Sequence, residues 1–190
     1  MNRSVSGIEL FETDSDYAAF EQILAEARNR FPGVRLCAYC LMPNHFYLVL
    51  WLSEDGVLSP FMQWLTATHT TRWRTYRDSV GRGHLYQSRF KGFLIRQDLH
   101  FLTVCRYVER NALRAGLARR EGGKNLRAEY WQWGSLAARD DPARRQILSE
   151  PWPVERPADW LEVVNRPDKM TELNAVRKCV EKGTPFGGVG

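Results

Sequence analysis

The sequence predicts an α+β sandwich, in which helices pack on an antiparallel β-sheet. Two β-rich runs, 34–42 and 45–52, are separated only by Pro43-Asn44, a spacing suited to an antiparallel hairpin. Apolar residues at helical spacing flank this pair, over 14–31 before it and 59–77 after it. The alternation of a hairpin with helices fits the α+β class.

Composition limits the class of protein further. Of the 190 residues, 44% are hydrophobic and 12% aromatic, so the chain can bury a core without a structural metal or disulfide. A net charge of +5 permits a polyanionic partner without proving one. The chain has no apolar run long enough to cross a bilayer and no signal-peptide pattern at residues 1–16, so we expect a cytoplasmic protein with no membrane partner.

Four cysteines are too few for a disulfide framework in a chain of this length. Cys37 and Cys40 have C-x-x-C spacing, but they lie in a strand-like run, where positions i and i+3 point to opposite faces. We therefore interpret them as small buried thiols rather than as half of a zinc site.

The first helix is expected over 14–31, with Asp14 or Ser15 as its cap and Pro32-Gly33 as its end. In the strand 45–52, alternate residues share a face, which carries His45, Tyr47, Val49 and Trp51. A lone histidine entering an apolar strand is more often a hydrogen-bonded core residue than a ligand, so its role stays open at this point.

The second helix is expected to start at Ser59, a cap followed by Pro60 at the first helical position, and to run to about Arg77. Residues 84–96 mix β-formers with cations and are expected to form one or two strands. Cations alternating with aromatic rings suit single-stranded nucleic acid, because the cations neutralise phosphates and the rings stack on bases. An ordinary edge strand with basic exposed positions is an equal alternative.

The third helix is expected over 99–118 with Asp98 as its cap. Tyr107 and Asn111 lie about 40° apart on a helical wheel, off the apolar stripe, and form a polar edge beside the core face. Three arginines flank this edge, at positions 106, 110 and 114. A solvated helix face with a partly buried tyrosine explains the same pattern.

Beyond residue 120 the composition shifts toward Gly, Arg, Asp, Pro and Trp, with short helices expected near 133–139 and 171–181. Taken together, several blocks of the chain resemble the REP-associated tyrosine transposases, a branch of the single-tyrosine transposases within the HUH nucleases. The blocks that carry the resemblance are AYCLMPNHFYLVL, GHLYQSRFKGF, CRYVERNALRAGL, YWQWGSL and the terminal KGTPFG.

The resemblance implies a ferredoxin-like sandwich and a division into two parts. Residues 1–120 would form the HUH-type single-tyrosine transposase domain. Residues 121–190 would form a C-terminal extension that packs on the same domain or contacts DNA. The family begins with a β-strand leading into an Asn-Arg pair, of which only Asn2-Arg3 is present here, so the first strand is expected to be short.

The resemblance also implies roles for individual residues. Tyr107 corresponds to the nucleophile, while His45 and Asn111 correspond to ligands of Mg²⁺ or Mn²⁺. Tyr47 stands where the family has a second histidine; a neutral phenol is a weak ligand, so we expect weakened metal affinity and reduced cleavage. The residues expected to bind DNA are Arg89, Lys91, Arg96, Tyr86, Phe90, Arg110 and Arg114.

The implied reaction is the cleavage and rejoining of single-stranded or hairpin DNA through a 5′-phosphotyrosine intermediate, as in DNA transposition. The alternative is a catalytically impaired, domesticated protein that binds repeat hairpins without cutting them. Tyr47 is the sequence feature that divides these two hypotheses. The sequence leaves open whether the protein acts as a monomer or as a homodimer.

Overall fold

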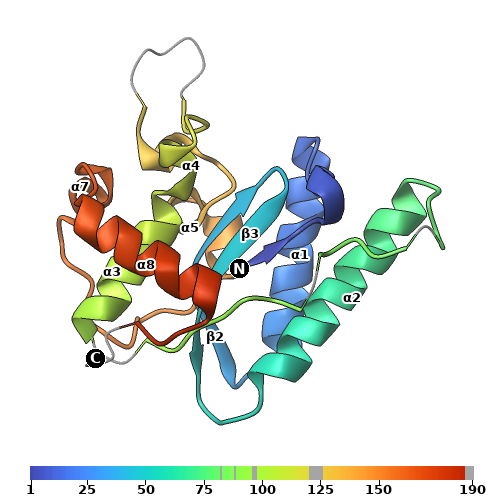
Figure 1. Cartoon of the computed structure of the whole chain (residues 1–190), viewed down its shortest axis with the longest axis horizontal. Coiled ribbons are helices and arrows are strands. Elements are labelled where there is room, and N and C mark those ends of the chain that lie inside the picture. The colour runs from blue at the N-terminus through green and yellow to red at the C-terminus, as the bar shows by residue number, and fades with distance from the viewer. Residues whose placement is uncertain (82, 88, 96–97, 120–125, 187–190) are drawn as a thin grey trace.

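A three-stranded antiparallel sheet lies between two layers of helices in the computed structural model (Figure 1). The structure describes residues 1–81, 83–87, 89–95, 98–119 and 126–186. The strands are β1 (Asn2–Arg3), β2 (Val34–Met42) and β3 (His45–Leu52), in the order β1-β3-β2. The predicted α+β class and the hairpin are confirmed, and β1 is short as expected.

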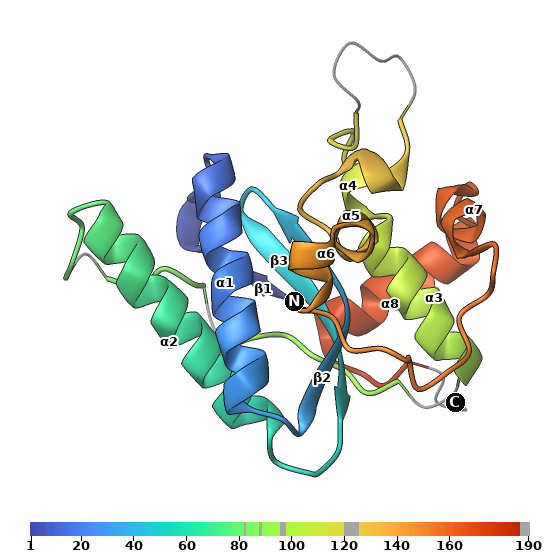
Figure 2. The ribbon, with the colours of Figure 1, turned by 180° about the vertical axis from the view of Figure 1, so that it is seen from behind.

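The helices α1 (Asp14–Arg30) and α2 (Leu58–Tyr76) pack side by side on one face of the sheet (Figure 2). Apolar residues of both helices and of the strands form the core beneath them, including Phe20, Leu65, Tyr39, Leu41 and Phe46. The order β1-α1-β2-β3-α2 follows the first five elements of the ferredoxin-like arrangement.

A second helical layer covers the other face of the sheet (Figure 2). It contains α3 (Asp98–Glu109), α4 (Asn111–Arg114), α7 (Trp160–Asn165) and α8 (Met170–Lys182). A second core, which includes Val49, Val104 and Val176, lies between this layer and the sheet. Because helices cover both faces, nearly every residue of β2 is buried, which explains its continuous apolar sequence.

Residues 126–186 contribute to both cores. Leu148 belongs to the core under α1 and α2, whereas Trp152 and Val164 belong to the core under α3. The short helices expected near 133–139 and 171–181 are present as α5 (Ser135–Asp140) and α8. The remaining short elements are η1 (Val5–Gly7), η2 (Ala128–Tyr130) and α6 (Pro142–Arg145). No helix among the described residues is long and apolar enough to cross a membrane.

The prediction that Cys37 and Cys40 face opposite sides of the sheet is wrong. A β-bulge between Leu36 and Ala38 inserts one residue into the ladder. It shifts the alternation so that both cysteines enter the core beneath α3. Both are buried free thiols, as expected.

Both helix starts on the first face differ from the prediction. Thr13, rather than Asp14 or Ser15, caps α1, and its backbone N–H donates to Asp16 Oδ2 at 2.9 Å in a capping box. The second helix begins at Leu58, so Ser59 is inside the helix rather than its cap. Pro60 fits there because N–H groups of the first turn have no partner within the helix.

Strands are expected over 84–96, but the described residues of that range, 84–87 and 89–95, form no regular strand. The segment makes isolated bridges, from Tyr86 to Ser4 and from Ile95 to Phe186, and Gln87 N donates to Arg3 O at 3.0 Å. With only two residues, β1 offers too short an edge for a regular ladder. The described residues of this segment therefore follow the β1 edge through isolated hydrogen bonds rather than a continuous ladder.

The predicted continuous helix 99–118 is also wrong, because it breaks at Arg110 between α3 and α4. In an unbroken helix the Tyr107 carbonyl would accept the backbone N–H of Asn111. Here it accepts a hydrogen bond from Arg114 Nη2 at 2.7 Å instead. A side chain thus replaces a helical bond between the predicted nucleophile and the residue four positions later.

Candidate active site

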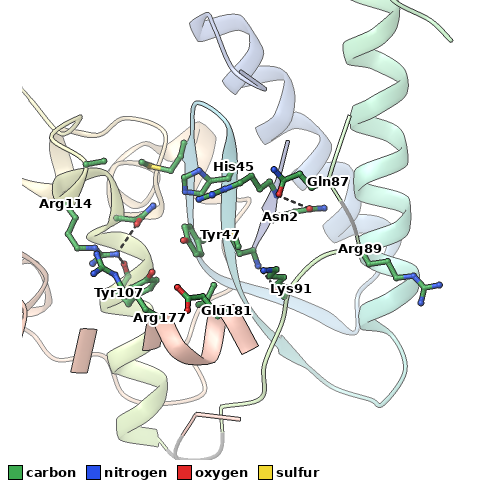
Figure 3. A pocket seen from close by; sticks show the side chains of 16 residues that line it. Asn2, His45, Tyr47, Gln87, Arg89, Lys91, Tyr107, Arg114, Arg177 and Glu181 are labelled. Carbon is green, nitrogen blue, oxygen red and sulfur yellow. Dashed lines mark hydrogen bonds between the residues drawn. The ribbon is translucent and has the colours of Figure 1, made fainter. Parts of the chain in front are cut away.

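A pocket of about 460 Å³ opens where β1, β3, α3, α4 and α8 meet (Figure 3). It brings together the five residues that the sequence analysis placed at the catalytic or metal site or beside it, and it adds several cations and polar groups from other elements. Its lining includes His45, Tyr47, Tyr107, Asn111, Arg114, Arg3, Gln87, Arg89, Lys91, Arg177 and Glu181.

Tyr107 projects from the last turns of α3 and its side chain is largely buried, with 8% of the residue exposed. The Arg114 guanidinium carbon lies 4.2 Å from the ring centroid, close enough for a cation–π interaction. The Tyr47 ring meets the same ring edge-on, with centroids 5.8 Å apart. A cation and a second phenol therefore fix the orientation of Tyr107.

His45 begins β3, and its ring lies 5.3 Å from the Tyr47 ring, centroid to centroid. Its Nδ1 is 2.7 Å from Asn44 Oδ1. Because that oxygen only accepts, Nδ1 carries the proton and Nε2 keeps its lone pair. Burial, reinforced by the positive charge of Arg3, lowers the pKa of His45 to about 4, so the imidazole is neutral at pH 7.

Tyr47 occupies the position between His45 and Tyr107. Burial raises the pKa of Tyr47 well above its ordinary value, and the neighbouring Tyr107 raises it further. Arg3 and Arg114 act in the opposite direction without reversing the shift. Tyr47 is therefore a neutral phenol in this pocket.

The metal ligands expected from the sequence do not fit Mg²⁺ or Mn²⁺, which prefer several carboxylate or carbonyl oxygens, because among the described residues that line the pocket only Glu181 carries a carboxylate. Neutral His45 is a competent donor, but the Asn111 Oδ1 atom already accepts a hydrogen bond from Arg114 Nη2 at 3.1 Å. The positive charge of Arg3, which disfavours protonation of His45, also repels a divalent cation. Within the described residues, no three His, Cys, Asp or Glu side chains gather closely enough to hold a metal ion.

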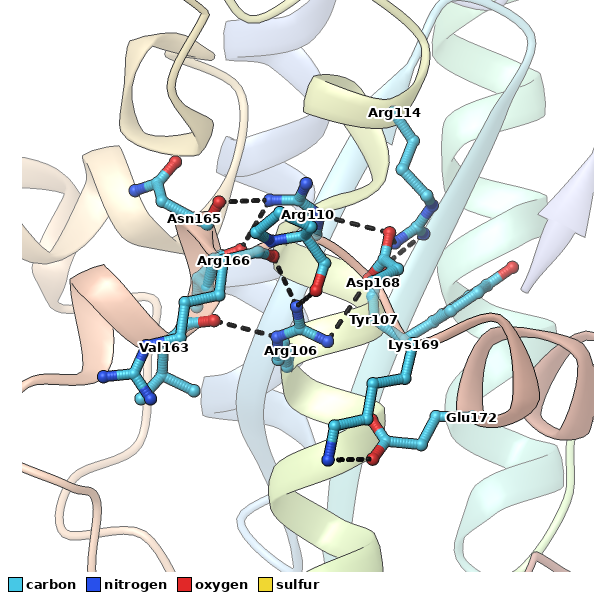
Figure 4. Close-up of polar contacts among 12 residues, drawn as sticks. Arg106, Tyr107, Arg110, Arg114, Val163, Asn165, Arg166, Asp168, Lys169 and Glu172 are labelled. Atoms are coloured by element: carbon cyan, nitrogen blue, oxygen red, sulfur yellow. Dashed lines mark hydrogen bonds and ion pairs between the residues drawn. The ribbon is translucent and has the colours of Figure 1, made fainter.

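Behind the pocket, three arginines from α3, from α4 and from the break between them converge on one carboxylate, Asp168, in the connection before α8 (Figure 4). Asp168 lies 3.2 Å from Arg106, 3.1 Å from Arg110 and 3.7 Å from Arg114. Arg106 and Arg110 also donate to carbonyls at the end of α7 and just beyond it. This network ties the C-terminal extension to the helix that carries Tyr107.

The other predicted DNA contacts are distributed over the fold. Arg89 and Lys91 line the pocket, although Figure 3 shows the Arg89 side chain extending away from Tyr107. Tyr86 turns inward, and its hydroxyl lies 2.6 Å from His69 Nδ1. Phe90 packs partly against the core under α1 and α2. Arg110 binds the Asp168 network rather than the pocket, and Arg96 lies outside the described residues.

Sequence reasoning missed several residues that complete or support the pocket. Arg177 and Glu181 come from α8, and their spacing of four residues on an expected helix indicated a shared face. Arg3 lies beside His45 because the two residues are partners in the antiparallel pairing of β1 with β3. Asp168 follows a proline in a loop, and nothing in its sequence neighbourhood marks it as the partner of three arginines.

These features define an α+β protein that holds an oriented tyrosine in a cation-lined pocket. The model of a family described as "Transposase IS200 like" matches residues 8–111, more than half of the 190-residue chain. The chain belongs to this IS200-like transposase family, which implies a transposase-like function with DNA as the partner. Comparison with curated proteins and comparison with solved structures each give no significant match.

The family match covers only part of the pocket. The matched range, 8–111, includes His45, Tyr47, Tyr107 and Asn111, and it ends at Asn111. The pocket continues beyond that limit, because Arg114, Arg177 and Glu181 also line it. Residues beyond position 111 therefore complete a site whose predicted catalytic and metal-binding residues lie within the family match.

Proposed function

We propose that the protein cleaves and rejoins single-stranded DNA, with Tyr107 as the nucleophile. The observation that carries the proposal is the position of Tyr107, whose ring is held between Arg114 and Tyr47 at a pocket also lined by Arg3, Lys91 and Arg177. A nucleophilic hydroxyl among cations suits attack on a phosphodiester, because the cations stabilise the negative charge that develops.

The recessed position of Tyr107 favours a single-stranded substrate. A phosphodiester must enter the pocket to reach a side chain that is only 8% exposed. A flexible single strand can bend into the pocket, whereas a stiff duplex holds its phosphates on its outer surface. A hairpin with a single-stranded flank offers both a defined structure and an accessible backbone.

In the proposed step, the Tyr107 hydroxyl oxygen attacks phosphorus as the bond from phosphorus to the 3′ oxygen breaks. The new bond joins Tyr107 to the 5′-phosphate, and the net movement of the phenol proton to the leaving oxygen gives a free 3′-OH. The reverse attack by another 3′-OH restores a phosphodiester and the tyrosine. Bond number is conserved, so no external energy source is needed.

The test is the formation of a covalent adduct with labelled DNA. We expect a hairpin oligonucleotide with a single-stranded flank to give a protein-linked band on a denaturing gel. Tyr107→Phe should abolish the band while leaving DNA binding nearly unchanged, since it removes only a hydroxyl. Tyr47→Phe is the matched control, because it removes a hydroxyl from the same pocket and should retain the band.

Two results would contradict the proposal. An adduct that survives in Tyr107→Phe but disappears in Tyr47→Phe would make Tyr47 the nucleophile. Tight DNA binding by the wild-type protein, with no adduct under any ionic condition, would favour the alternative of a DNA-binding protein that does not cut.

A further inference from the structure

Arg114 makes an unusual set of contacts for a side chain that lines a pocket. Its Nη2 atom donates to the Tyr107 carbonyl and to Asn111 Oδ1, and its guanidinium lies over the Tyr107 ring. These contacts place one planar cation against the predicted nucleophile, Tyr107, and one of the predicted metal ligands, Asn111. The arrangement fixes the cation relative to the attacking oxygen.

The other end of the guanidinium has hydrogen-bonding capacity to spare. Arg114 Nη1 is buried and has no hydrogen-bond partner among the described residues. Its nearest acid, Asp168, lies 3.7 Å away, a distance suited to an ion pair rather than a hydrogen bond. A buried N–H donor without a partner is unfavourable, and an anionic oxygen entering the pocket would satisfy it.

The pocket thus offers few ligand atoms for a divalent cation, but several cationic N–H groups that can donate hydrogen bonds to a phosphate. We propose that Arg114 binds the scissile phosphate in place of a divalent ion, with Asp168 as the residue that positions it. This inference rests on the proposed function, since it assigns the charge-stabilising group of the same strand-transfer reaction. It predicts that the reaction of this chain proceeds without a metal.

The chemistry of the step requires added positive charge. A phosphodiester carries one negative charge, and attack by Tyr107 concentrates further charge on its nonbridging oxygens before the 3′ oxygen leaves. A guanidinium can donate to those oxygens with two parallel N–H groups and is fully charged at neutral pH. Arg3, Lys91 and Arg177 at the same pocket would reinforce it.

The first arm of the experiment uses the wild-type protein alone. Adduct formation with the hairpin oligonucleotide is timed under single-turnover conditions in excess EDTA and, separately, in Mn²⁺. We expect rates within about threefold of each other. A rate at least a hundredfold higher in Mn²⁺ would overturn the inference while leaving the proposed function intact.

The second arm changes the guanidinium and its partner. Arg114→Gln should slow the adduct rate in EDTA by about a hundredfold, the usual effect of removing one donor that stabilises the transition state. Arg114→Lys keeps the charge but not the planar fork, and should lose about tenfold. Asp168→Asn should slow the rate, and Asp168→Glu should restore most of it, as expected of a positioning residue.

Arg106→Gln is the matched control. Arg106 pairs with the same Asp168 carboxylate, and its replacement by Gln removes the same charge, but Arg106 does not line the pocket. We expect its adduct rate to stay within about threefold of wild type. Equal losses in Arg106→Gln and Arg114→Gln would assign Arg114 a structural role only and would overturn the inference.

A binding measurement tests the phosphate-binding role of Arg114 even if the proposed function fails. Should the wild-type protein give no adduct in any condition, anisotropy of a labelled single-stranded oligonucleotide in EDTA replaces the rate. About tenfold weaker binding by Arg114→Gln than by Arg106→Gln would support Arg114 as the phosphate ligand. Equal affinities of these two variants would overturn it.

Discussion

The guanidinium of Arg114 lies against the face of the Tyr107 ring and donates a hydrogen bond to the Tyr107 carbonyl at 2.7 Å. This one contact links three features of the molecule. It replaces the helical bond that is lost where α3 ends, it orients the tyrosine, and it brings a cation from beyond the family match into the pocket. The local break in the helix is thus part of how the site is built.

Tyr47→His should create a response to Mn²⁺ that the wild-type protein lacks. Positions 45 and 47 share a face of β3, so the change places a second imidazole beside His45, where the wild type has a neutral phenol. We expect at least tenfold tighter Mn²⁺ binding by calorimetry. Equal affinities would mean that Tyr47 does not stand in the place of a ligand.

Lys91→Ala should reduce the salt dependence of single-stranded DNA binding. Each direct phosphate contact contributes about 0.7 to the slope of log affinity against log salt for a single strand, so the slope should flatten by roughly that amount. Arg72→Ala is the control, because Arg72 pairs with Glu26 and does not line the pocket. Unchanged slopes in Lys91→Ala would remove this side of the pocket from the DNA interface.

Acid should destabilise the fold through His69. This residue is 3% exposed, and burial lowers its pKa to about 3, with Arg77 lowering it and Asp16 raising it. In the unfolded chain His69 binds a proton near pH 6.5, whereas in the folded chain it stays neutral down to about pH 3. The free energy of unfolding therefore decreases as the pH falls below about 6.5.

By pH 4.5 the loss from His69 should reach about 2.5 kcal/mol. Urea unfolding at pH 7 and pH 4.5 measures it, and His69→Gln should show a smaller difference between the two conditions. His45, with its pKa lowered to about 4, contributes a loss of the same sign that remains in this variant. An identical pH dependence in wild type and His69→Gln would contradict the assignment.

Glu109→Ala should lower the free energy of unfolding by about 3–5 kcal/mol, the usual result of removing one partner from a buried ion pair. The fully buried carboxylate of Glu109 accepts hydrogen bonds from Ser135 and Trp160 and pairs with Arg139. Urea denaturation measures the change. Glu26→Ala removes an acid from an exposed pair and should change stability by less than about 1 kcal/mol.

The sequence predicted the parts of the fold that follow from local periodicity. The hairpin and the alternation along β3 were predictable because successive residues of a strand point to opposite faces. This alternation correctly grouped His45 with Tyr47. The inward turn of Tyr86 was not predictable, because its partner His69 lies 17 residues earlier on α2.

Other features depend on contacts that no local pattern encodes. The bulge that turns Cys37 and Cys40 to one side depends on strand register. Helical spacing alone indicated a continuous helix, whereas α3 ends before Arg110 and the Tyr107 carbonyl accepts a side-chain hydrogen bond from Arg114. Asp168 joins the site through residues 54–62 positions away in the chain, so tertiary structure was needed to find it.

The central claim is that Tyr107 is the residue that DNA becomes joined to, and peptide mapping of the adduct tests it most directly. Trypsin cleaves after Arg106 and Arg110 and so isolates Tyr107 in the four-residue peptide 107–110, whereas Tyr47 falls in the separate peptide 36–72. After nuclease digestion of the bound DNA, mass spectrometry should find a nucleotide phosphate on peptide 107–110. A nucleotide found on peptide 36–72, with peptide 107–110 unmodified, would contradict the account.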